Sequence, residues 1–297
     1  MTKRLSAVIG TLRAPFLLLT PACVLPGIAS AAHAPGPFVA AHAWLSVAGG
    51  LLAHVSVNTF NEYLDFRSGL DGRTKRTAFS GGSGSLPANP DAVAGTLAVA
   101  VASLLATAAV GMYFLALRGA ALLPLGLLGL FLVVAYTNGL TRSPWACLIA
   151  PGLGFGAMTL GTHVAIAGSY SAPAAAASLV PFFLANNLLL LNQFPDVEAD
   201  ASVGRRHLAI TAGRPLAARV YALFAALAYV TMVAAVAIRL LPVGSLLGLC
   251  TLPLAAVAAS GAVRHADAPQ LLGPTMRMNV LVALLTPVLM AAGMLLG

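Results

Sequence analysis

The sequence has little charge and little cysteine. Only 8% of its 297 residues are charged and 59% are hydrophobic, whereas roughly 25% of residues are charged in soluble globular domains. Together with a mean hydropathy of +0.92, this excludes an ordinary soluble protein and indicates one that crosses a membrane several times. The 3 cysteines all fall in apolar segments without a Cys-x-x-Cys pair, so they indicate neither a disulfide framework nor a zinc site.

Long apolar segments make up most of the chain, and a spanning helix needs about 20 such residues. We predict an all-α membrane protein with a single domain over residues 1–297 and about nine transmembrane helices in one bundle. The predicted spans are residues 14–34, 38–60, 92–115, 119–138, 145–167, 173–194, 216–238, 242–263 and 275–296. The basic start and the small residues near 30–34 also resemble a secretory signal, but prolines interrupt that stretch, so we expect a first spanning helix.

Basic residues are distributed unequally between the two sides of the predicted membrane. Of the 16 basic residues, only Arg118 and Arg239 fall on one side. The others are Lys3, Arg4, Arg13, Arg67, Arg73, Lys75, Arg76, Arg142, Arg205, Arg206, Arg214, Arg219, Arg264 and Arg277. Because basic loops stay in the cytoplasm, this predicts a cytoplasmic N-terminus and an external C-terminus in the inner (cytoplasmic) membrane. The charge therefore reflects topology and contact with anionic lipid rather than nucleic-acid binding.

The few acidic residues collect on the predicted cytoplasmic side, mainly in two connections, 61–91 and 195–215, which we predict to cap the bundle. The 8 acids are Glu62, Asp65, Asp71, Asp91, Asp196, Glu198, Asp200 and Asp267. The pattern Asn61-x3-Asp65 recurs 131 residues later (61 to 192 and 65 to 196) as Asn192-x3-Asp196. This weak internal repeat is consistent with a duplicated four-helix unit plus one extra helix.

Both acidic clusters present oxygen ligands without histidine or cysteine. If the second span continues as a helix, Asn61 and Asp65 share one face, and a turn at 68–69 brings Asp71 near. The second cluster places a polar side chain every four residues, but Pro195 is expected to kink or break that helix. The candidate metal ligands are Asn61, Asp65, Asp71, Asn192, Asp196 and Asp200. Such hard oxygens suit Mg²⁺ or Mn²⁺; the alternative is that these are solvated loop carboxylates paired with arginine.

Cationic side chains near both clusters are candidates to bind an oxyanion held by metal. They are Arg67, Arg73, Lys75, Arg76, Arg205 and Arg206. The run SGGSGS at 80–85 is either a backbone nest for phosphate or a flexible linker. His54 and His163 lie within apolar spans, where packing between helices is favoured over a role in binding an acceptor.

These patterns resemble the UbiA superfamily of intramembrane prenyltransferases. NEYLDFRSGLD at 61–71 is similar to that family's first motif, in the wide-spaced form typical of its menaquinone branch, the 1,4-dihydroxy-2-naphthoate polyprenyltransferases. NQFPDVEADASVGRRHLAITAG at 192–213 resembles the second motif. YTNG at 136–139 and FGAMTLGTHVAIAGSYS at 155–171 carry weaker similarity.

The resemblance implies an all-helical bundle with a lipid-accessible cavity that is capped by the two acidic loops. It implies that the six oxygen ligands bind two Mg²⁺ ions, that Asp65 and Asp196 are catalytic, and that the metals bridge the diphosphate of a polyprenyl diphosphate. Arg67, Lys75, Arg76, Arg205 and Arg206, with Tyr136, would contact that diphosphate. Tyr136 is alternatively an interfacial anchor. The implied partners are a polyprenyl diphosphate, a small aromatic acceptor and the lipid bilayer.

Several departures from the family pattern leave the acceptor open. Glu62 stands where Asp is common, His207 replaces the usual Thr, Thr162-His163 stands where Thr-Tyr is frequent, and a Gly-Leu-Gly-Glu sequence is absent near 141–146. The favoured acceptor is 1,4-dihydroxy-2-naphthoate, with 4-hydroxybenzoate, homogentisate, a chlorophyllide or a lipid as alternatives. A cation-binding transporter is the alternative of another class, although transporters more often place ionisable groups near the membrane centre.

Overall fold

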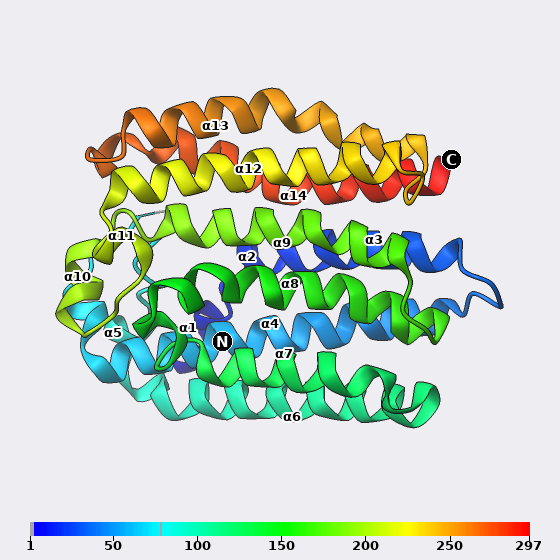
Figure 1. The fold of residues 1–297 in the computed structure, drawn as a ribbon. Helices are drawn as coiled ribbons and strands as arrows, with labels where there is room; N and C mark the ends of the chain where they lie inside the picture. The colour runs from blue at the N-terminus through cyan, green and yellow to red at the C-terminus, as the bar shows by residue number, and fades with distance from the viewer. Residues whose placement is uncertain (1–2, 78) are drawn as a thin grey trace.

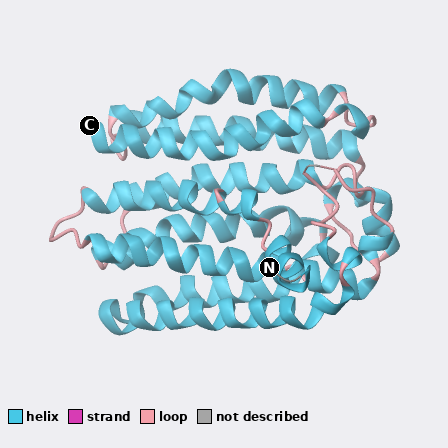
Figure 2. Ribbon diagram, turned by 180° about the vertical axis from the view of Figure 1, so that it is seen from behind, coloured by secondary structure: helices cyan, strands magenta, loops and turns pink. Residues whose placement is uncertain are grey.

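The computed structural model describes residues 3–77 and 79–297, and these contain helices and loops but no strand (Figure 2). The long helices lie side by side in one bundle, with most connections gathered at its two ends (Figure 1). They are α4 (Ala40–Ser68), α6 (Val93–Arg118), α7 (Leu123–Ala135), α8 (Pro144–Ala167), α9 (Ala172–Asn192), α12 (Arg214–Ala237), α13 (Leu252–Arg264) and α14 (Gly273–Leu296), and the 3-10 segment η5 (Val243–Thr251) leads into α13. The all-helical fold class is therefore confirmed.

The N-terminal segment is a bent series of shorter helices. It consists of α1 (Lys3–Thr11), α2 (Ala14–Leu17) and α3 (Leu19–Ala32), and the axis bends by 42° at the break before α3. Arg13, between α1 and α2, has a left-handed backbone with φ 54°. The predicted span at 14–34 thus corresponds to α2 and α3 together, and α1 precedes it as a separate element.

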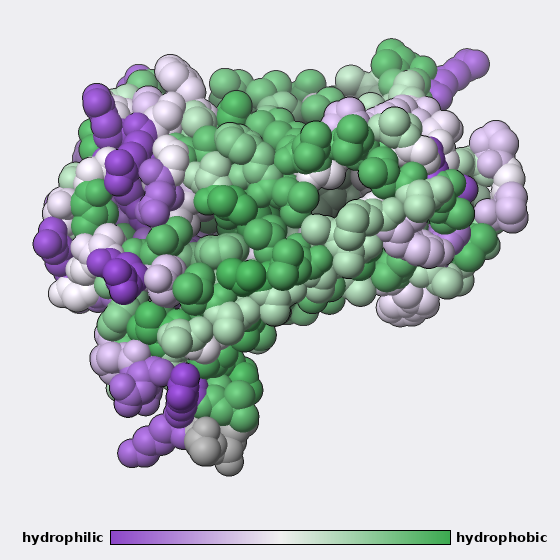
Figure 3. All heavy atoms as spheres, turned by 90° about the horizontal axis from the view of Figure 1, so that it is seen from below, coloured by the Kyte–Doolittle hydropathy of each residue, from purple (hydrophilic) through white to green (hydrophobic). Residues whose placement is uncertain are grey.

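Among the described residues, 7 helices are long and apolar enough to cross a membrane, or 8 if the bent N-terminal pair is one span. One of the 7 is the 46-residue segment Pro90–Ala135, which contains both α6 and α7. An apolar band separates two hydrophilic ends of the molecule (Figure 3). The exposed Trp44 and Trp145, 73% and 67% accessible, lie at the starts of α4 and α8, which are at opposite ends of the bundle. This placement fits the aromatic belts of a membrane protein.

Small residues allow the inner helices to approach closely. A Cβ on Gly27 of α3 would lie 2.2 Å from the Thr159 carbonyl oxygen of α8, and one on Gly244 of η5 would lie 2.1 Å from the Gly293 carbonyl oxygen of α14. Such contacts between small residues stabilise helix pairs in lipid, where hydrophobic burial contributes little to association. The same close packing holds α9 against α8, where a Cβ on Gly152 would lie 2.4 Å from the Phe182 carbonyl oxygen.

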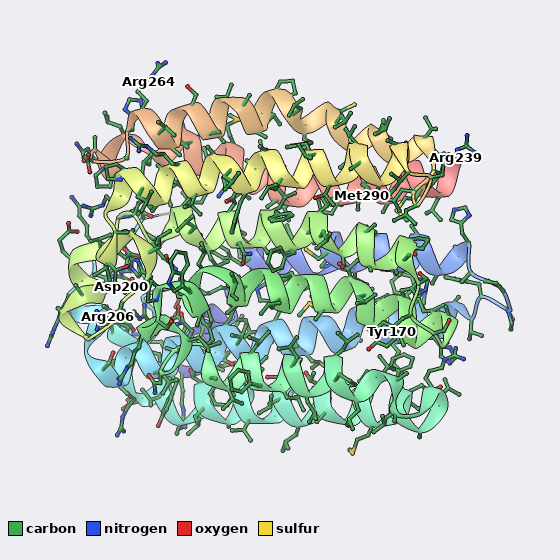
Figure 4. The ribbon with its side chains drawn as sticks, in the orientation of Figure 1. Tyr170, Asp200, Arg206, Arg239, Arg264 and Met290 are labelled. Carbon is green, nitrogen blue, oxygen red and sulfur yellow. The ribbon has the colours of Figure 1, made fainter. Side chains whose placement is uncertain are left out.

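The two predicted cap connections lie at the same end of the bundle, but both are more helical than expected. Helix α4 continues to Ser68 and ends where Gly69 adopts φ 75°, so residues 61–68 of the predicted loop are helical because no helix-breaking residue precedes Gly69. In the second connection, α9 ends at Asn192, and the short α10 (Val197–Ser202) and α11 (Leu208–Thr211) follow. Asp200, Arg206 and Arg264 lie at this end, and Arg239 and Tyr170 lie at the other (Figure 4).

Candidate functional site

The two acidic motifs line a single cavity of about 160 Å³ at the end of the bundle that carries α5 (Ser85–Ala88), α10 and α11. All six predicted oxygen ligands contribute to its wall: Asn61, Asp65, Asp71, Asn192, Asp196 and Asp200. Residues that are 131 positions apart in the sequence are therefore brought together. This juxtaposition is the structural basis of the candidate site.

In the first motif, a continuous helix presents the polar side chains. Asn61 and Asp65 are one turn apart on α4, and Asn61 Nδ2 donates to Thr137 Oγ1 at 3.3 Å. The left-handed Gly69 then reverses the chain into the short 3-10 turn η1 (Leu70–Gly72). Asp71 lies in this turn and returns to the same cavity as Asp65.

In the second motif, the helix is interrupted before the carboxylates, as Pro195 predicted. After α9 ends at Asn192, the Asp196 N–H donates to the Gln193 carbonyl oxygen at 3.2 Å in a turn. A new helix begins there, and the Asp200 N–H donates to the Asp196 carbonyl oxygen at 2.8 Å. The three polar residues thus reach the cavity from two separate helical pieces rather than from one continuous helix face.

One guanidinium links the two motifs. Arg205 pairs through NH2 with Asp65 Oδ1 and, through NH1, with Asp200 Oδ1 at 2.8 Å. His207 Nε2 contacts the other oxygen, Asp200 Oδ2, at 3.1 Å. Because Asp65 and Asp200 are 8% and 4% exposed, they need a buried cation to offset their loss of hydration. The single positive charge of Arg205 is shared by the two carboxylates that face each other across the cavity, so it neutralises them in part.

The other two carboxylates each keep one oxygen that no described residue contacts through a hydrogen bond. Asp71 Oδ2 and Asp196 Oδ1 are buried and have no hydrogen-bond partner within residues 3–77 and 79–297, and the same holds for Asn192 Oδ1. Burial, followed by the nearby Glu62 carboxylate, raises the pKa of Asp71 to about 6. Burial, followed by the nearby Asp200 carboxylate, raises the pKa of Asp196 to about 7. Both groups are thus held in surroundings that penalise their negative charge.

The donor set fits a hard divalent cation that is completed by ligands from outside the protein. These three buried oxygens are available to a ligand, and carboxylate and amide oxygens are the ligands that Mg²⁺ prefers. Among the described residues, no three His, Cys, Asp or Glu side chains converge into a ready-made metal cluster. Mg²⁺ is usually held by one or two carboxylates together with water and substrate phosphate oxygens, so this open arrangement suits it.

The glycine-rich run after the first motif folds against both motifs. The Gly81 N–H donates to Asp196 Oδ2 at 3.2 Å. Two residues later, the Ser83 N–H and hydroxyl donate to Glu62 Oε1 at 2.7 Å and Oε2 at 2.6 Å. The run was predicted to be a nest for phosphate or a flexible linker. The N–H groups of Gly81 and Ser83 instead donate to carboxylates of the protein, so this backbone shapes the site.

The predicted diphosphate contacts separate into two groups. Arg205 and Tyr136 line the cavity. The remaining four, Arg67, Lys75, Arg76 and Arg206, are exposed at the surface beside it. The side chain of Arg206 points away from the cavity (Figure 4), whereas its backbone N–H donates to the Thr141 carbonyl oxygen at 2.8 Å. These four would reach a bound diphosphate only after a side-chain or loop movement.

The structure adds Arg13 to the site and places the two histidines of the apolar spans. Arg13 lines the cavity, and its Nε lies 3.3 Å from Glu62 Oε1. In the sequence it is only one of the basic residues that indicate the topology. His54 lines the cavity and contacts Thr20 Oγ1 through Nδ1 at 2.8 Å. His163 is buried, and neither of its ring nitrogens has a hydrogen-bond partner among the described residues. No spacing signal pointed to Arg13, because the break that orients it is a feature of the fold.

Away from the carboxylates, the cavity wall becomes apolar. Phe16, Leu19, Phe155, Leu188 and Leu189 line it. A site with a charged, oxygen-rich end and an apolar wall fits an amphiphilic molecule with an anionic head and a hydrocarbon chain. Such a wall also keeps water away from reactive groups at the boundary.

Comparisons with known proteins agree with this geometry. The sequence model of the UbiA prenyltransferase family matches residues 20–281. A structure described as digeranylgeranylglyceryl phosphate synthase has a TM-score of 0.66 at 12% identity, with 100% of both chains covered. A UbiA homologue from Aeropyrum pernix K1 has a TM-score of 0.66 at 19% identity, covering 94% of this chain and 96% of that one.

A third solved structure carries ligands of its own. It is a UbiA homologue from Archaeoglobus fulgidus bound to DMAPP and Mg²⁺, with a TM-score of 0.59 at 15% identity, covering 97% of this chain and 98% of that one. At these identities the structural matches show a shared fold. Among curated proteins, none matches the sequence significantly.

Proposed function

The chain belongs to the UbiA prenyltransferase family and is a multi-pass membrane prenyltransferase; we propose that it transfers a polyprenyl group from polyprenyl diphosphate to an aromatic quinone precursor in an Mg²⁺-dependent reaction. The observation that carries the proposal is the single cavity in which both acidic motifs meet an apolar wall. In the Archaeoglobus fulgidus homologues, the bound ligands are DMAPP or GPP with Mg²⁺, which supports the same substrate class here.

The unpartnered oxygens of Asp71, Asn192 and Asp196, together with Asp65 and Asp200, would hold two Mg²⁺ ions. When bound, Mg²⁺ supplies positive charge that stabilises a departing diphosphate. Arg205, already between the two motifs, adds a fixed cation whose donors can bind phosphate oxygens.

The apolar part of the cavity would act on the other half of the donor. Phe155, Leu188 and Leu189 would surround the first isoprene unit and exclude water while the allylic carbon develops positive charge. The acceptor carbon then forms the new bond as the carbon–oxygen bond to diphosphate breaks, and the proton on the acceptor carbon is lost. If the reacting carbon of the acceptor carries a carboxylate, CO₂ leaves instead of that proton.

For the acceptor, we propose 1,4-dihydroxy-2-naphthoate. The wide spacing from Asp65 to Asp71 in NEYLDFRSGLD, resembling the menaquinone branch, supports this choice. The structure adds a reason for the spacing, since the Gly69 turn and η1 fill the interval and return Asp71 to the cavity.

For the topology, we propose nine membrane crossings in the inner membrane, with the N-terminus and the site in the cytoplasm and the C-terminus outside. Within Pro90–Ala135, α7 folds back beside α6, which supports counting two crossings there. The concentration of basic residues at the site end supports the orientation.

One experiment tests the proposed reaction. Membranes that contain the protein are given a polyprenyl diphosphate, Mg²⁺ and a panel of acceptors: 1,4-dihydroxy-2-naphthoate, 4-hydroxybenzoate, homogentisate, a chlorophyllide and a glycerol-phosphate lipid. The expected product is a prenylated naphthoquinol whose mass shows the loss of CO₂, and Asp65→Ala or Asp196→Ala abolishes it. Product from another acceptor would redirect the assignment within the family, and undiminished turnover in both variants would contradict the roles of these carboxylates.

A further inference from the structure

Residues 80–84, Ser-Gly-Gly-Ser-Gly, form a strap that crosses from the first acidic motif to the second. The strap lies in the connection after η1 and leads into α5. It begins at a turn in which the Thr77 hydroxyl accepts the N–H groups of Phe79 and Ser80 at 3.1 Å and 3.0 Å. Its position matters because it contacts a residue of each motif.

At one side, Glu62 holds the strap with both of its oxygens. Ser83 donates its N–H and its hydroxyl to the two oxygens at 2.7 Å and 2.6 Å, and Arg13 lies 3.3 Å from Oε1. Glu62 is only 1% exposed, and it is not among the residues that line the cavity. Among the described residues, the hydrogen bonds of Glu62 run to the strap and its ion pair runs to Arg13. Its role therefore differs from that of Asp65, one turn along the same helix.

At the other side, the strap reaches Asp196. The Gly81 N–H donates to Oδ2 at 3.2 Å. Burial raises the pKa of this carboxyl, and the nearby Ser80 side chain lowers it in part. The remaining oxygen, Oδ1, has no hydrogen-bond partner among the described residues. Gly81 therefore orients Asp196, so that one oxygen is fixed by the strap and the other is left for a ligand.

Glycine is needed where the strap passes the first motif. Gly82 has φ +72°, and a Cβ there would lie 3.1 Å from Asp71 Oδ1 and 3.4 Å from Glu62 Oε1. Ser80 and Gly82 line both the site cavity and a second cavity of about 380 Å³. Because cavities adjoin the strap, its contacts with Glu62 and Asp196 add to the packing of Thr74 and Arg76 against Gly81.

We propose that Glu62 is a positioning residue of the second acidic motif, 134 residues away in sequence (62 to 196), and that it acts by clamping the 80–84 strap whose Gly81 N–H orients Asp196. The clamp itself follows from the contacts of Glu62, and its effect on prenyl transfer rests on the proposed function. Loss of the clamp frees the strap, lets the Asp196 carboxylate rotate and weakens the binding of Mg²⁺ between the motifs.

The test uses Glu62→Gln in the purified full-length protein, with Glu198→Gln as the matched control. Glu198 is an acid at the same end of the bundle, but it pairs with Arg214 at 2.8 Å and does not contact the strap. The first measurement is the rate of trypsin cleavage after Arg76, because a Cβ on Gly84 would overlap the Arg76 guanidinium, so this arginine rests on the strap. The second is prenyl transfer as a function of Mg²⁺ concentration.

Losing a charge-assisted clamp on one carboxylate is expected to raise the cleavage rate after Arg76, and the apparent KM for Mg²⁺, by about tenfold each. At saturating Mg²⁺, kcat is expected to change by less than about threefold, since the metal itself then orders Asp196. Glu198→Gln leaves both quantities at the wild-type values. A merely structural role for Glu62 would lower the amount of active enzyme, and therefore kcat, without shifting the Mg²⁺ dependence.

A second variant, Ser83→Ala, keeps the N–H donor and removes the hydroxyl, so it tests the clamp if Glu62→Gln does not fold. We expect about threefold effects on both measurements. Wild-type cleavage and Mg²⁺ dependence in a folded Glu62→Gln, or in Ser83→Ala when the former does not fold, would overturn the proposal. If the wild-type protein forms no prenyl product at all, the proposed function fails, whereas the cleavage assay still decides on the clamp.

Discussion

The two acidic motifs have the same Asn-x3-Asp spacing but different backbones. The first lies on the unbroken α4 and turns at Gly69, and the second is divided between the end of α9 and α10 by the turn at Pro195. Despite this difference, each motif contributes one carboxylate that is neutralised by Arg205 and one with an unpartnered oxygen. Asp65 and Asp200 form the neutralised pair, and Asp71 and Asp196 form the unpartnered pair.

The comparison teaches that position in the motif does not set the electrostatic role of a carboxylate. Asp65 and Asp196 are the matching positions of the repeat, yet one is paired with a guanidinium and the other is held by the strap. A buried charge without a cation is unfavourable in the empty protein and becomes favourable when a divalent cation arrives. The unpartnered pair is therefore expected to respond to ligands, and the neutralised pair to support the fold.

The largest expected effect comes from replacing the two matching aspartates, Asp65→Asn and Asp196→Asn. Both variants are expected to lose prenyl transfer by about 10³-fold, because each removes a charge that holds the diphosphate site together. Their stabilities should differ: Asp65→Asn weakens a charge-assisted bond to Arg205, whereas Asp196→Asn removes a buried charge that pairs with no cation among the described residues. The melting temperature should therefore be lower for Asp65→Asn than for Asp196→Asn. Product formation and thermal unfolding without Mg²⁺ measure both. Equal stability changes in the two variants would remove the distinction.

A second prediction concerns the cation between the motifs. Arg205→Gln leaves two buried carboxylates facing each other and is expected to lower the free energy of unfolding by about 3 kcal/mol. Because the defect is excess negative charge, Mg²⁺ should restore more stability to this variant than to the wild-type protein. Thermal unfolding with and without Mg²⁺ measures this. Arg264→Gln, at the same end of the bundle and exposed, is the control and should shift neither value.

The third prediction is a dependence of stability on pH that arises from the unpartnered pair. With a pKa raised from 3.8 to about 7 for Asp196 and to about 6 for Asp71, the folded protein binds more protons than the unfolded chain. The stability from these groups is therefore fully present below about pH 4 and is lost as the pH rises through 6 to 7. The melting temperature of the metal-free protein should fall over this range.

Mg²⁺ should reverse that trend, because it binds the carboxylates only in their ionised form. Its apparent affinity is expected to increase by about tenfold per pH unit below pH 7, as one proton is displaced from the site. Titrations of Mg²⁺ monitored by thermal unfolding between pH 5 and 8 test this. In Asp196→Asn the slope should become shallower, and an unchanged slope would assign the effect to other groups.

The sequence predicted the parts of the molecule that depend on pattern. Composition predicted an all-helical membrane protein, and the repeat of Asn61-x3-Asp65 linked two distant segments that line the same cavity in the structure. The break at Pro195 was also predictable, since proline lacks an N–H donor. The predicted loop began at residue 61, whereas the helix continues to residue 68. The boundary was placed too early because polar residues mark where a helix leaves the membrane, not where the helix ends.

The remaining parts depend on three-dimensional contacts that no spacing records. Arg205 and Arg206 are adjacent and identical in type, yet one enters the cavity and the other faces outward. Glu62 and Asp65 both carry carboxylates on α4, but one faces the strap and the other the cavity. In both pairs, the direction in which each side chain leaves the backbone and the path of the neighbouring loop decide what the side chain contacts. Both are known only from the folded structure.

The smallest expected effect concerns His207. It contacts Asp200 but not Asp65, so it distinguishes the two members of the neutralised pair. Its Nε2 lies 3.1 Å from Asp200 Oδ2, and Asp65 is not among the contacts of any histidine described here. Because Arg205 still holds the other oxygen of Asp200, His207→Gln should raise the apparent KM for Mg²⁺ by only about threefold, the loss of one modest hydrogen bond. His265→Gln, at the same end of the bundle, provides the control. An effect of His207→Gln as large as that of Asp196→Asn would mean that Asp200 is not held mainly by Arg205, and the division into a neutralised and an unpartnered pair would have to be redrawn.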